Sequence, residues 1–337
     1  MKRVVDTLII TNLPSFYKIN LYNKIAEHKR VFVVFTGHAN NGRNSDFFKG
    51  EKKFGYVHLC EGRIKQMIQL LMLLCTTRYS ELQLGGWDSL LLWLAAFFSP
   101  KRKNAVVVES SYHESATTGL KGFIKRMFIN RVLKVYASGK DQKQLTDLLG
   151  FKGHTIITKG VGVFNYIKQP KYTARQEVKN FLYVGRLTEV KNLDYLVDKF
   201  NNHPELNLSI IGFGELEDSL RAKAAANTTF LGAINNSDLS QYYQQADVFI
   251  LPSKSEPWGL VVEEALNNGT PVMVSDRVGC AGEIINSENG VIFTLNPDNF
   301  EAQLAKIRDV RTYNEMRKYI STMDFETIEQ QQVDCYL

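Results

Sequence analysis

Cysteine is scarce in this chain, and its spacing excludes both a disulfide framework and a zinc cluster. Four cysteines occur in 337 residues, and none is paired at metal-binding or redox spacing: Cys60, Cys75, Cys280 and Cys335. We therefore expect free thiols in a reducing cytoplasm. Long apolar runs are also lacking, because no stretch reaches the roughly 20 uncharged residues that span a bilayer. The early run Val4–Thr11 leads into Asn12 and Pro14, which predicts a first strand and no signal peptide.

Charge is unevenly spread along the sequence. Residues 1–165 contain 25 Lys and Arg and 11 Asp and Glu, a net charge of +14, whereas residues 166–337 contain 16 and 24, a net charge of −8. Such asymmetry indicates that the first half meets an anionic partner, such as a lipid headgroup surface, a nucleic acid or a phosphorylated acceptor. No recognisable nucleic-acid-binding motif occurs, so we expect no nucleic acid among the partners.

Short apolar runs alternate with longer helical patterns throughout the chain. Val, Ile, Leu and Phe dominate these runs with little polar alternation, which is typical of parallel strands covered on both faces. The intervening helices imply right-handed crossovers and a doubly wound α/β sheet. The predicted strands are Val4–Thr11, Val31–Thr36, Tyr56–Leu59, Glu81–Leu84, Ala105–Glu109, Lys134–Ala137, Thr155–Lys159, Asn180–Gly185, Leu206–Ile211, Thr228–Leu231, Val248–Leu251, Pro271–Ser275 and Val291–Phe293.

The strand pattern restarts near residue 180, after the polar stretch Lys168–Lys179. A single core rarely grows beyond about 250–300 residues, so the length also favours two domains. We predict a first domain over residues 1–165, a second over 166–320, and a final helix over 321–337 that crosses back to the first. Ligands of open α/β sheets lie beyond the carboxyl ends of the strands, and two such domains facing each other would form a cleft there.

The segment Ser253–Ser275 carries the strongest motif. A helix is predicted from Gly259 to Asn268, with Gly269 as its stop. The free N–H groups at the start of this helix suit an anion such as a diphosphate. Glu256 and Glu264 stand eight positions apart, and each carboxylate can accept two hydroxyl hydrogen bonds. The pair could therefore hold sugar and ribose hydroxyls on either side of a phosphate.

This segment resembles the E-x7-E motif of the retaining glycosyltransferases of family 4 (group 1), which have the GT-B fold and use nucleotide-sugar donors. Val184–Asn192 resembles the family's G-R-L-x-x-x-K segment, Ile210–Leu220 resembles its G-x-G loop, and Phe230–Ser253 also matches. The resemblance implies a GT-B fold of two Rossmann-like, doubly wound parallel-sheet domains that face a cleft. It also implies a donor site made of Arg186, Lys191, Ile234, Glu256, Gly259, Leu260 and Glu264.

Within that implied site, Arg186 and Lys191 would contact the donor diphosphate, and two cations beside a helix N-terminus suit such a group. Ile234 would lie against the base, although its side chain could equally belong to the core. The Ile210–Leu220 loop has a second interpretation as a tight turn between a strand and a helix. Glu283 matches a glutamate common in the family, and helix capping is its alternative role.

The first half resembles the family more loosely. Many members carry a glycine-rich loop after the first strand, but Thr11–Ile25 contains no glycine. Pro14, Ser15 and Tyr17 follow the first strand, which predicts an acceptor-side loop at the cleft. His113 resembles a histidine that lies beside the transferred sugar in several members, and a purely structural role is its alternative.

The resemblance implies transfer on one face of the sugar without an enzyme nucleophile, with the leaving diphosphate helping to take the acceptor proton. The protein would supply positioning and charge stabilisation. We assign His113, Arg186, Lys191 and Glu256 to catalysis. We expect no metal and no cofactor besides the donor, because no metal cluster is apparent and cations can replace a divalent ion.

Two stretches combine basic and apolar residues in a way that indicates contact with a membrane surface. Gly62–Leu74 has basic residues before an apolar helix, and Gly119–Lys134 mixes five basic residues with Phe123, Ile124, Met127 and Phe128. Ordinary buried helices of an α/β domain are the alternative. With the +14 charge, these stretches predict a peripheral contact with an anionic membrane, and thus a cytoplasmic protein at the membrane face.

The predicted activity is transfer of a sugar from a nucleotide-diphosphate sugar to a glycan or lipid-linked acceptor, in surface polysaccharide biosynthesis. One alternative is a sugar phosphorylase or a nucleotide-sugar epimerase with the same fold, although the E-x7-E segment argues against an epimerase. Another is a degenerate scaffold that binds nucleotide sugar or membrane, although the intact Glu256, Glu264, Arg186 and Lys191 argue against it.

Overall fold

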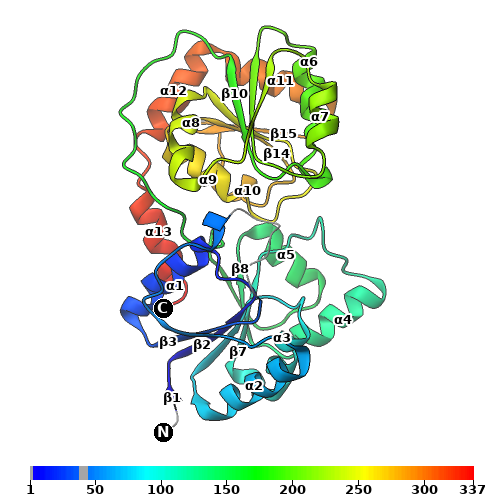
Figure 1. The fold of residues 1–337 in the computed structure, drawn as a ribbon, viewed down its shortest axis with the longest axis vertical. Coiled ribbons are helices and arrows are strands. Elements are labelled where there is room, and N and C mark those ends of the chain that lie inside the picture. The colour runs from blue at the N-terminus through cyan, green and yellow to red at the C-terminus, as the bar shows by residue number, and fades with distance from the viewer. Residues whose placement is uncertain (1–2, 38–44) are drawn as a thin grey trace. The chain divides into compact units, whose positions relative to one another are not determined.

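The structure, a computed structural model, describes residues 3–37 and 45–337. The chain divides into two compact units (Figure 1). The N-terminal unit contains Met1–Phe164 and Thr327–Leu337, and the C-terminal unit contains Asn165–Glu326. No helix among the described residues is long and apolar enough to cross a membrane.

The N-terminal unit is built on a seven-stranded parallel sheet in the order β4-β3-β2-β6-β7-β8-β9. Its first strand, β2, pairs with β3 on one side and with β6 on the other, so the chain winds outward in both directions from the middle. A separate two-stranded sheet pairs β1 with β5. The strands are β1 (Arg3–Val4), β2 (Thr7–Thr11), β3 (Val31–Phe35), β4 (Gly55–His58), β5 (Thr77–Arg78), β6 (Glu81–Leu84), β7 (Asn104–Val108), β8 (Lys134–Ala137) and β9 (His154–Ile157).

The C-terminal unit has a six-stranded parallel sheet in the order β12-β11-β10-β13-β14-β15. Here β10 is first in the chain and lies between β11 and β13, so the winding direction reverses between β10 and β13. Ligands of such sheets bind at this topological switch point. The strands are β10 (Asn180–Val184), β11 (Asn207–Ile211), β12 (Thr228–Gly232), β13 (Val248–Leu251), β14 (Val272–Ser275) and β15 (Gly290–Phe293).

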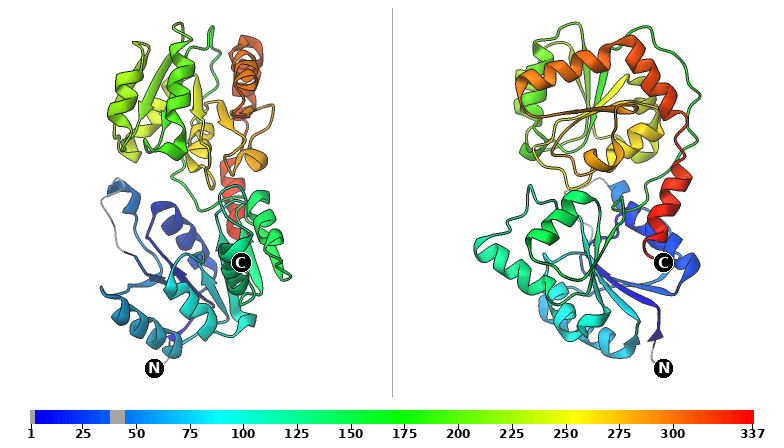
Figure 2. Two further views of the ribbon diagram at one scale, coloured as in Figure 1. Left: turned by 90° about the vertical axis from the view of Figure 1, so that its right-hand side faces the viewer. Right: turned by 180° about the vertical axis from the view of Figure 1, so that it is seen from behind.

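Helices lie on both sides of each sheet, as the two views of Figure 2 show. Every residue of β2, β3, β13 and β14 is buried, which explains why β3 and β13 are continuously apolar and why β2 and β14 have polar residues only at their ends. The helices are α1 (Phe16–His28), α2 (Arg63–Thr76), α3 (Leu90–Phe98), α4 (Gly119–Ile129), α5 (Lys140–Leu148), α6 (Leu193–Asn201), α7 (Glu217–Lys223), α8 (Leu239–Gln245), α9 (Leu260–Asn267), α10 (Ala281–Ile284), α11 (Pro297–Arg308), α12 (Val310–Ile320) and α13 (Phe325–Asp334). The 3-10 helices are η1 (Ser45–Phe48), η2 (Lys101–Lys103), η3 (Glu189–Lys191) and η4 (Asn236–Asp238).

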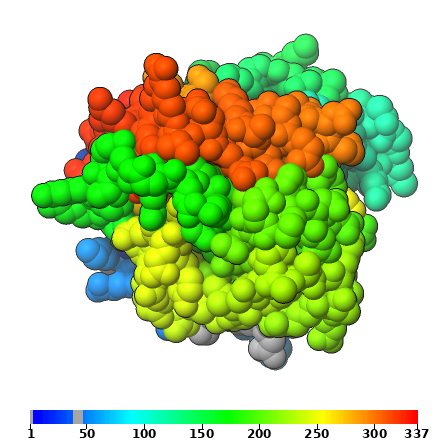
Figure 3. Space-filling view, turned by 90° about the horizontal axis from the view of Figure 1, so that it is seen from above, coloured from blue at the N-terminus to red at the C-terminus, as the bar shows by residue number. Residues whose placement is uncertain are grey.

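The segment that leads into β10 is held along α12 by hydrogen bonds. Asn314 accepts from the Arg175 amide at 2.9 Å, and Arg317 donates to the Thr173 carbonyl at 3.0 Å. Figure 3 shows the green atoms of this segment beside the orange atoms of α11 and α12. Residues 165–179, at the predicted boundary between the two domains, thus contain no helix or strand but pack on the C-terminal unit.

The last residues of the chain belong to the N-terminal unit. Glu329 in α13 forms an ion pair with Lys24 at 2.9 Å, and the ring of Tyr336 stacks on Tyr136 with 4.7 Å between centroids. The chain passes from the C-terminal to the N-terminal unit after residue 326, a few residues beyond the boundary at 320 that the sequence predicts. Phe325 stays with the C-terminal unit, where it contacts the Tyr166 ring.

The predicted α/β class with two Rossmann-like parallel sheets is confirmed, and each of the thirteen predicted strands overlaps an observed one. Two details were wrong. The run Val4–Thr11 is broken into β1 and β2, because Asp6 turns to bind Arg30. The last predicted strand of the first half ends at Ile157, and Lys159 adopts a left-handed backbone with φ of 53°.

Candidate active site

The switch point of the C-terminal sheet brings together the loops after β10 and β13. The amide of Lys254, after β13, donates to the carbonyl of Val190, after β10, at 2.9 Å. Asn192 donates to the Pro252 carbonyl at 3.2 Å, and its own backbone is left-handed with φ of 58°. These bonds hold two predicted site segments, far apart in the sequence, against each other.

Lys191 and Glu256 form an ion pair across this switch point, from the Lys191 Nζ to the Glu256 Oε2. The two side chains are 13% and 15% exposed, so the pair is shielded without being fully buried. The Glu256 backbone is also fixed, because its amide donates to the Arg277 carbonyl and its carbonyl accepts from the Gly279 amide. The motif residues predicted from two separate segments therefore meet in one place.

Tyr183 and Arg186 lie close to this pair. The Tyr183 hydroxyl donates to the Arg186 carbonyl at 2.9 Å. Burial raises the pKa of Tyr183 well above its usual value; the negative charge of Glu256 adds to the rise and the positive charge of Arg186 opposes it. The Arg186 side chain itself is exposed, so its guanidinium is accessible to a ligand.

The G-x-G loop after β11 requires glycine because its backbone packs closely against the segment after β10. A Cβ on Gly212 would meet the Gly185 carbonyl oxygen at 1.8 Å, and one on Gly214 would meet the Leu187 carbonyl oxygen at 2.4 Å. The Phe213 carbonyl accepts from the Leu187 amide at 2.9 Å. These contacts favour the tight-turn interpretation: the loop supports the Arg186 segment from the side.

Helix α9 begins beside Glu256. Gly259 precedes its first residue with a left-handed φ of 100°, and a Cβ there would lie 2.9 Å from the Cγ1 of Val278 and 3.5 Å from the Cγ of Glu256. The first N–H groups of a helix have no intrahelical acceptor. Leu260 opens the helix, so its amide is one of these. The helix ends at Asn267 with Gly269 following at φ of 79°, close to the predicted stop.

Two neighbouring glutamates on α9 are held in different ways. Glu264, the second motif carboxylate, accepts a hydrogen bond from the Tyr243 hydroxyl at 3.0 Å, and burial raises its pKa to about 7. Glu263 is 5% exposed and accepts from the Trp258 indole N–H at 2.8 Å. Burial raises the pKa of Glu263 to about 8, and the Glu264 charge adds to that rise. Sequence reasoning missed Glu263, because the E-x7-E spacing does not reveal which of two adjacent carboxylates is buried.

Two further predicted residues, Ile234 and Glu283, follow β12 and β14 in the chain. Ile234 is partly buried in the loop after β12, the edge strand of the sheet. Glu283 lies in the single-turn helix α10, where its amide donates to the Cys280 carbonyl at 3.0 Å. Their assigned roles at the base and near the donor stay predictions.

The N-terminal unit holds the remaining predicted residues at the ends of its strands. Pro14 and Ser15 are buried between β2 and α1, and Ser15 takes the N-cap position of α1. Tyr17 is partly buried, and its carbonyl accepts from the Val163 amide at 2.9 Å. His113 follows β7. Its Nε2 lies 3.8 Å from the Asp141 carboxylate of α5, and its ring lies 3.9 Å from that of Tyr112.

Sequence reasoning missed a second charged cluster in this unit. Lys18 in α1 forms an ion pair with Glu109, after β7, at 2.8 Å. The Lys18 side chain is 15% exposed; burial lowers its pKa, but the charge of Glu109 more than offsets this and the pKa is raised. Asp88 follows Gly85 and Gly86 after β6 and lines a hollow together with Glu109. The run G-G-W-D directly after a predicted strand was the signal that could have shown it.

Metal-binding groups are not apparent: among residues 3–37 and 45–337, no cluster of three or more His, Cys, Asp or Glu side chains could hold an ion. The four cysteines are free thiols, and Cys60 and Cys75 are exposed. Burial raises the pKa of the Cys280 thiol well above its usual value. The expectation that the reaction needs no metal stays a prediction.

Comparison with known proteins links the C-terminal unit to one family. The family model described as "Glycosyl transferases group 1" matches residues 166–323. An uncharacterised glycosyltransferase of Methanocaldococcus jannaschii is 38% identical over 135 residues, which cover 37% of this chain and 34% of that protein. The O-antigen biosynthesis glycosyltransferase WbnH of Escherichia coli is 33% identical over 175 residues, covering 51% and 49%. These matches thus span about a third to a half of the relatives' own length.

Solved structures extend the likeness to the whole fold. Sucrose-phosphate synthase from Thermosynechococcus elongatus superposes with a TM-score of 0.75 at 17% identity, covering 99% of this chain and 98% of that one. HepE of Anabaena, solved in complex with UDP and glucose, gives a TM-score of 0.72 at 15% identity, covering 97% and 98%. Both units therefore have the sheets of the GT-B fold, and residues 166–323 of this chain match the model of the glycosyl transferases group 1 family.

Proposed function

We propose that this chain is a retaining glycosyltransferase of family 4 that transfers a sugar from a nucleotide-diphosphate sugar to a glycan or lipid-linked acceptor. The observation that carries the proposal is the Lys191–Glu256 ion pair at the switch point, beside the start of α9. A lysine, an exposed arginine and free helix amides converge there, and this set suits a diphosphate. The O-antigen relative favours an acceptor in surface polysaccharide biosynthesis.

In the proposed reaction, the bond between the sugar anomeric carbon and the diphosphate oxygen breaks, and the acceptor oxygen forms the new glycosidic bond on the same face. The acceptor hydroxyl proton passes to the leaving diphosphate. Arg186, Lys191 and the amides of Gly259 and Leu260 would stabilise the charge that develops on that diphosphate. His113 would position the sugar from the N-terminal unit. No metal is proposed.

Glu256 and Glu264 would hold hydroxyl groups of the donor. The Lys191 ion pair orients the Glu256 carboxylate, whose oxygens can accept hydrogen bonds from the sugar. Glu264 already accepts one hydrogen bond from Tyr243, which leaves capacity for a ribose hydroxyl. Ile234 would lie against the base. Pro14, Ser15 and Tyr17 would belong to the acceptor side.

A peripheral contact with an anionic membrane is the second part of the proposal. Helix α4 exposes Leu120, Phe123 and Met127 to 74%, 57% and 43%, with Lys121 and Lys125 on the same helix. Helix α2 exposes a stripe at every fourth residue: Ile64, Ile68 and Met72. Basic and apolar side chains on one exposed helix are typical of interfacial anchors. The protein would then act at the cytoplasmic face of the membrane.

The proposal is tested by donor binding to the purified chain. UDP- and GDP-sugars are screened by thermal shift and titration calorimetry against the wild type, Lys191→Ala and Glu256→Ala. Loss of a charge-assisted hydrogen bond is worth about 1.5–3 kcal/mol, so we expect each variant to weaken donor binding roughly tenfold to hundredfold. Release of the free nucleotide on addition of an acceptor then separates a transferase from a phosphorylase.

Lys199→Ala is the matched control. The Lys199 side chain is 14% exposed and forms a 2.7 Å ion pair with Glu301, on α6 and α11 of the same unit. It therefore resembles Lys191 in burial and pairing but lies outside the strand ends. Equal losses of donor affinity in Lys199→Ala and Lys191→Ala, or no binding of any nucleotide sugar to the wild type, would contradict the proposal.

A further inference from the structure

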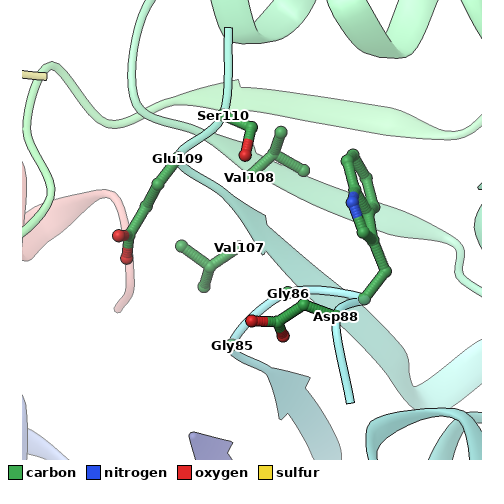
Figure 4. Close-up of a pocket in the computed structure, with 8 residues that line it drawn as sticks. Gly85, Gly86, Asp88, Val107, Val108, Glu109 and Ser110 are labelled. Carbon is green, nitrogen blue, oxygen red and sulfur yellow. The ribbon is translucent and has the colours of Figure 1, made fainter. Parts of the chain in front are cut away.

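A small polar hollow lies beyond the ends of β6 and β7 in the N-terminal unit (Figure 4). Its volume is about 150 Å³. Gly85 and Gly86 line it without side chains, so the hollow stays open beside the strand end. Asp88, Glu109 and Ser110 bring two carboxylates and a hydroxyl to its lining.

The chemistry of this hollow suits a hydroxylated ring. Glu109 is held by its ion pair with Lys18, so its carboxylate has a fixed position. Asp88 is exposed and forms no ion pair or hydrogen bond with any other residue in the described ranges. Each carboxylate can accept hydrogen bonds from two hydroxyl groups, whereas two carboxylates would repel a phosphate. A sugar head group matches this set.

An apolar groove continues from the polar hollow and shares two of its lining residues, Trp87 and Asp88. The groove has a volume of about 300 Å³, and its other lining residues are Ser89, Leu90, Trp93 and Ile124, from α3, α4 and the loop before α3. Leu90 is 67% exposed and Ile124 is 42% exposed. The Trp93 indole N–H donates to the Trp87 carbonyl at 2.9 Å, so its polar group is already satisfied within the protein.

The groove opens onto further apolar surface. A third hollow of about 370 Å³ shares Ser89 and Leu90 with it and continues between α2 and α3. Phe97 and Phe98 at the end of α3 are 48% and 50% exposed. A path therefore runs from two carboxylates, past two tryptophans, to exposed apolar helices. Contiguous exposed apolar surface on a soluble protein typically marks a ligand-binding groove or an interaction site.

We infer that the acceptor is an amphiphile, whose hydroxylated head group enters the hollow of Asp88 and Glu109 and whose hydrocarbon chain lies along Leu90, Trp93 and Ile124. This inference rests on the proposed glycosyltransferase function and narrows its acceptor from any glycan to one joined to a hydrocarbon chain. A free glycan would leave the apolar groove unused. A membrane contact alone would not need a carboxylate-lined hollow that continues into the groove.

Hexyl and octyl β-glucoside, below their critical micelle concentrations, are the probes of the full-length chain. Tryptophan fluorescence reports binding, because Trp87 and Trp93 line the path while the third tryptophan, Trp258, is buried in the other unit. We expect affinity to rise about fourfold for each methylene that the groove buries. The octyl-to-hexyl affinity ratio therefore measures the contribution of the groove.

Variants separate the two parts of the site. Leu90→Asn combined with Ile124→Asn should bring the octyl-to-hexyl ratio close to one. Asp88→Asn should weaken both glucosides severalfold and leave the ratio unchanged. Leu148→Asn is the matched control, because Leu148 is 49% exposed on α5 and lines neither hollow. The inference is overturned if the double variant keeps the wild-type ratio, if Leu148→Asn lowers it equally, or if octyl glucoside causes no fluorescence change.

Two further measurements identify other outcomes. Vesicles of phosphatidylglycerol and phosphatidylcholine test the membrane alternative: if the double variant loses vesicle binding but keeps the octyl-to-hexyl ratio, the groove serves a bilayer and the inference fails. Thermal shifts with UDP- and GDP-sugars monitor the donor site. No shift of the wild type with any of them counts against the proposed function, whereas a shift with one of them but no chain-length effect overturns only the acceptor inference.

Discussion

At the scale of single residues, two adjacent carboxylates on α9 have different hydrogen-bond partners. Glu264 is the motif residue, whereas Glu263 points into the core against Trp258. Adjacent positions on a helix face directions about 100° apart, so the two carboxylates have different neighbours: Glu264 contacts Tyr243, and Glu263 contacts Trp258. A buried carboxylic acid is tolerated because it remains neutral near pH 7 and accepts the indole hydrogen bond.

The buried Glu263 predicts that stability falls as pH rises. Burial raises its pKa in the folded chain to about 8 from the ordinary value of 4.5, so the folded state binds the proton more tightly than the unfolded state. The stabilisation is complete below pH 4.5 and is lost as pH rises towards 8. Within that window we expect the free energy of unfolding to fall by up to about 1.4 kcal/mol per pH unit.

Urea unfolding at several pH values checks this expectation. Glu263→Gln keeps the acceptor for Trp258 without a titrating group, so its unfolding free energy should depend less on pH between 4.5 and 8. Glu288→Gln changes an exposed glutamate of the same unit and should leave the slope as in the wild type. A slope that Glu263→Gln does not reduce would show that other groups set the pH dependence.

At the scale of elements, the loop that leads into α9 depends on one glycine. Gly259 has φ of 100°, and the chain around it is tied to the loop after β14 by the bond from the Cys280 amide to the Trp258 carbonyl at 2.9 Å. A side chain at this position strains the backbone and contacts Val278. The helix start, and with it the proposed diphosphate site, therefore follows from a residue without a side chain.

Gly259→Ala should lower the free energy of unfolding by at least about 1–2 kcal/mol, because a non-glycine residue in the left-handed region loses that much. Donor binding should fall with it. Gly282→Ala is the control: a Cβ at Gly282 meets no atom within 4 Å, and this glycine lies in α10. A Gly-to-Ala change at a compatible site stabilises by about 0.4–1 kcal/mol. Chemical denaturation should show a lower free energy of unfolding for Gly259→Ala and a higher one for Gly282→Ala. Equal changes in the two variants would contradict the special role of Gly259.

The amphipathic patterns of α2 and α4 do not reveal which face of each helix is buried. Sequence patterns predict α2 and α4 as helices with basic and apolar residues, with membrane contact and burial in an α/β domain as alternatives. In the structure Leu70 and Leu74 are buried in the core and Met67 and Leu73 pack against it, whereas Ile64, Ile68 and Met72 of the same helix are exposed. Helical periodicity gives the direction of each side chain around the axis, but only packing against the sheet decides which face is covered.

At the scale of the whole molecule, the segment Thr327–Leu337 belongs to the N-terminal unit. Tyr336 is 3% exposed, stacks on Tyr136, and its carbonyl accepts a hydrogen bond from Lys29. Burial raises the pKa of Tyr336, as expected of a phenol inside the unit. Residues that are more than 300 positions from Lys29 thus stabilise the N-terminal sheet.

Tyr336→Ala should destabilise the N-terminal unit by about 3–5 kcal/mol, the usual range for removing a buried large aromatic ring. Calorimetry with and without UDP should resolve the effect: the transition of the N-terminal unit moves to lower temperature, and the transition that UDP raises does not. Tyr172→Ala, at a tyrosine that is 40% exposed in the C-terminal unit, should change neither transition. A joint shift of both transitions in Tyr336→Ala would instead indicate one cooperative unit.

Local sequence patterns were enough to predict the strands, the two-sheet organisation and the residues of the motif. Strands such as Val31–Phe35 and Val248–Leu251 are continuously apolar because both faces of a parallel sheet are covered, and that signal is local. The Glu256 and Lys191 motifs were also visible locally, since their residue types and spacing match one family. Their assignment to the donor site stays a prediction.

Tertiary structure alone decided which of these local features meet. Strand order places the loops after β10 and β13 side by side, so Lys191 contacts Glu256 across 65 positions of sequence. The pairing of β6 with β7 likewise brings Asp88 near Glu109, and Leu90 and Ile124 are exposed beside them. Residue type and periodicity are properties of a short segment, whereas neighbours across a sheet depend on how all its strands pair. No single segment contains that information.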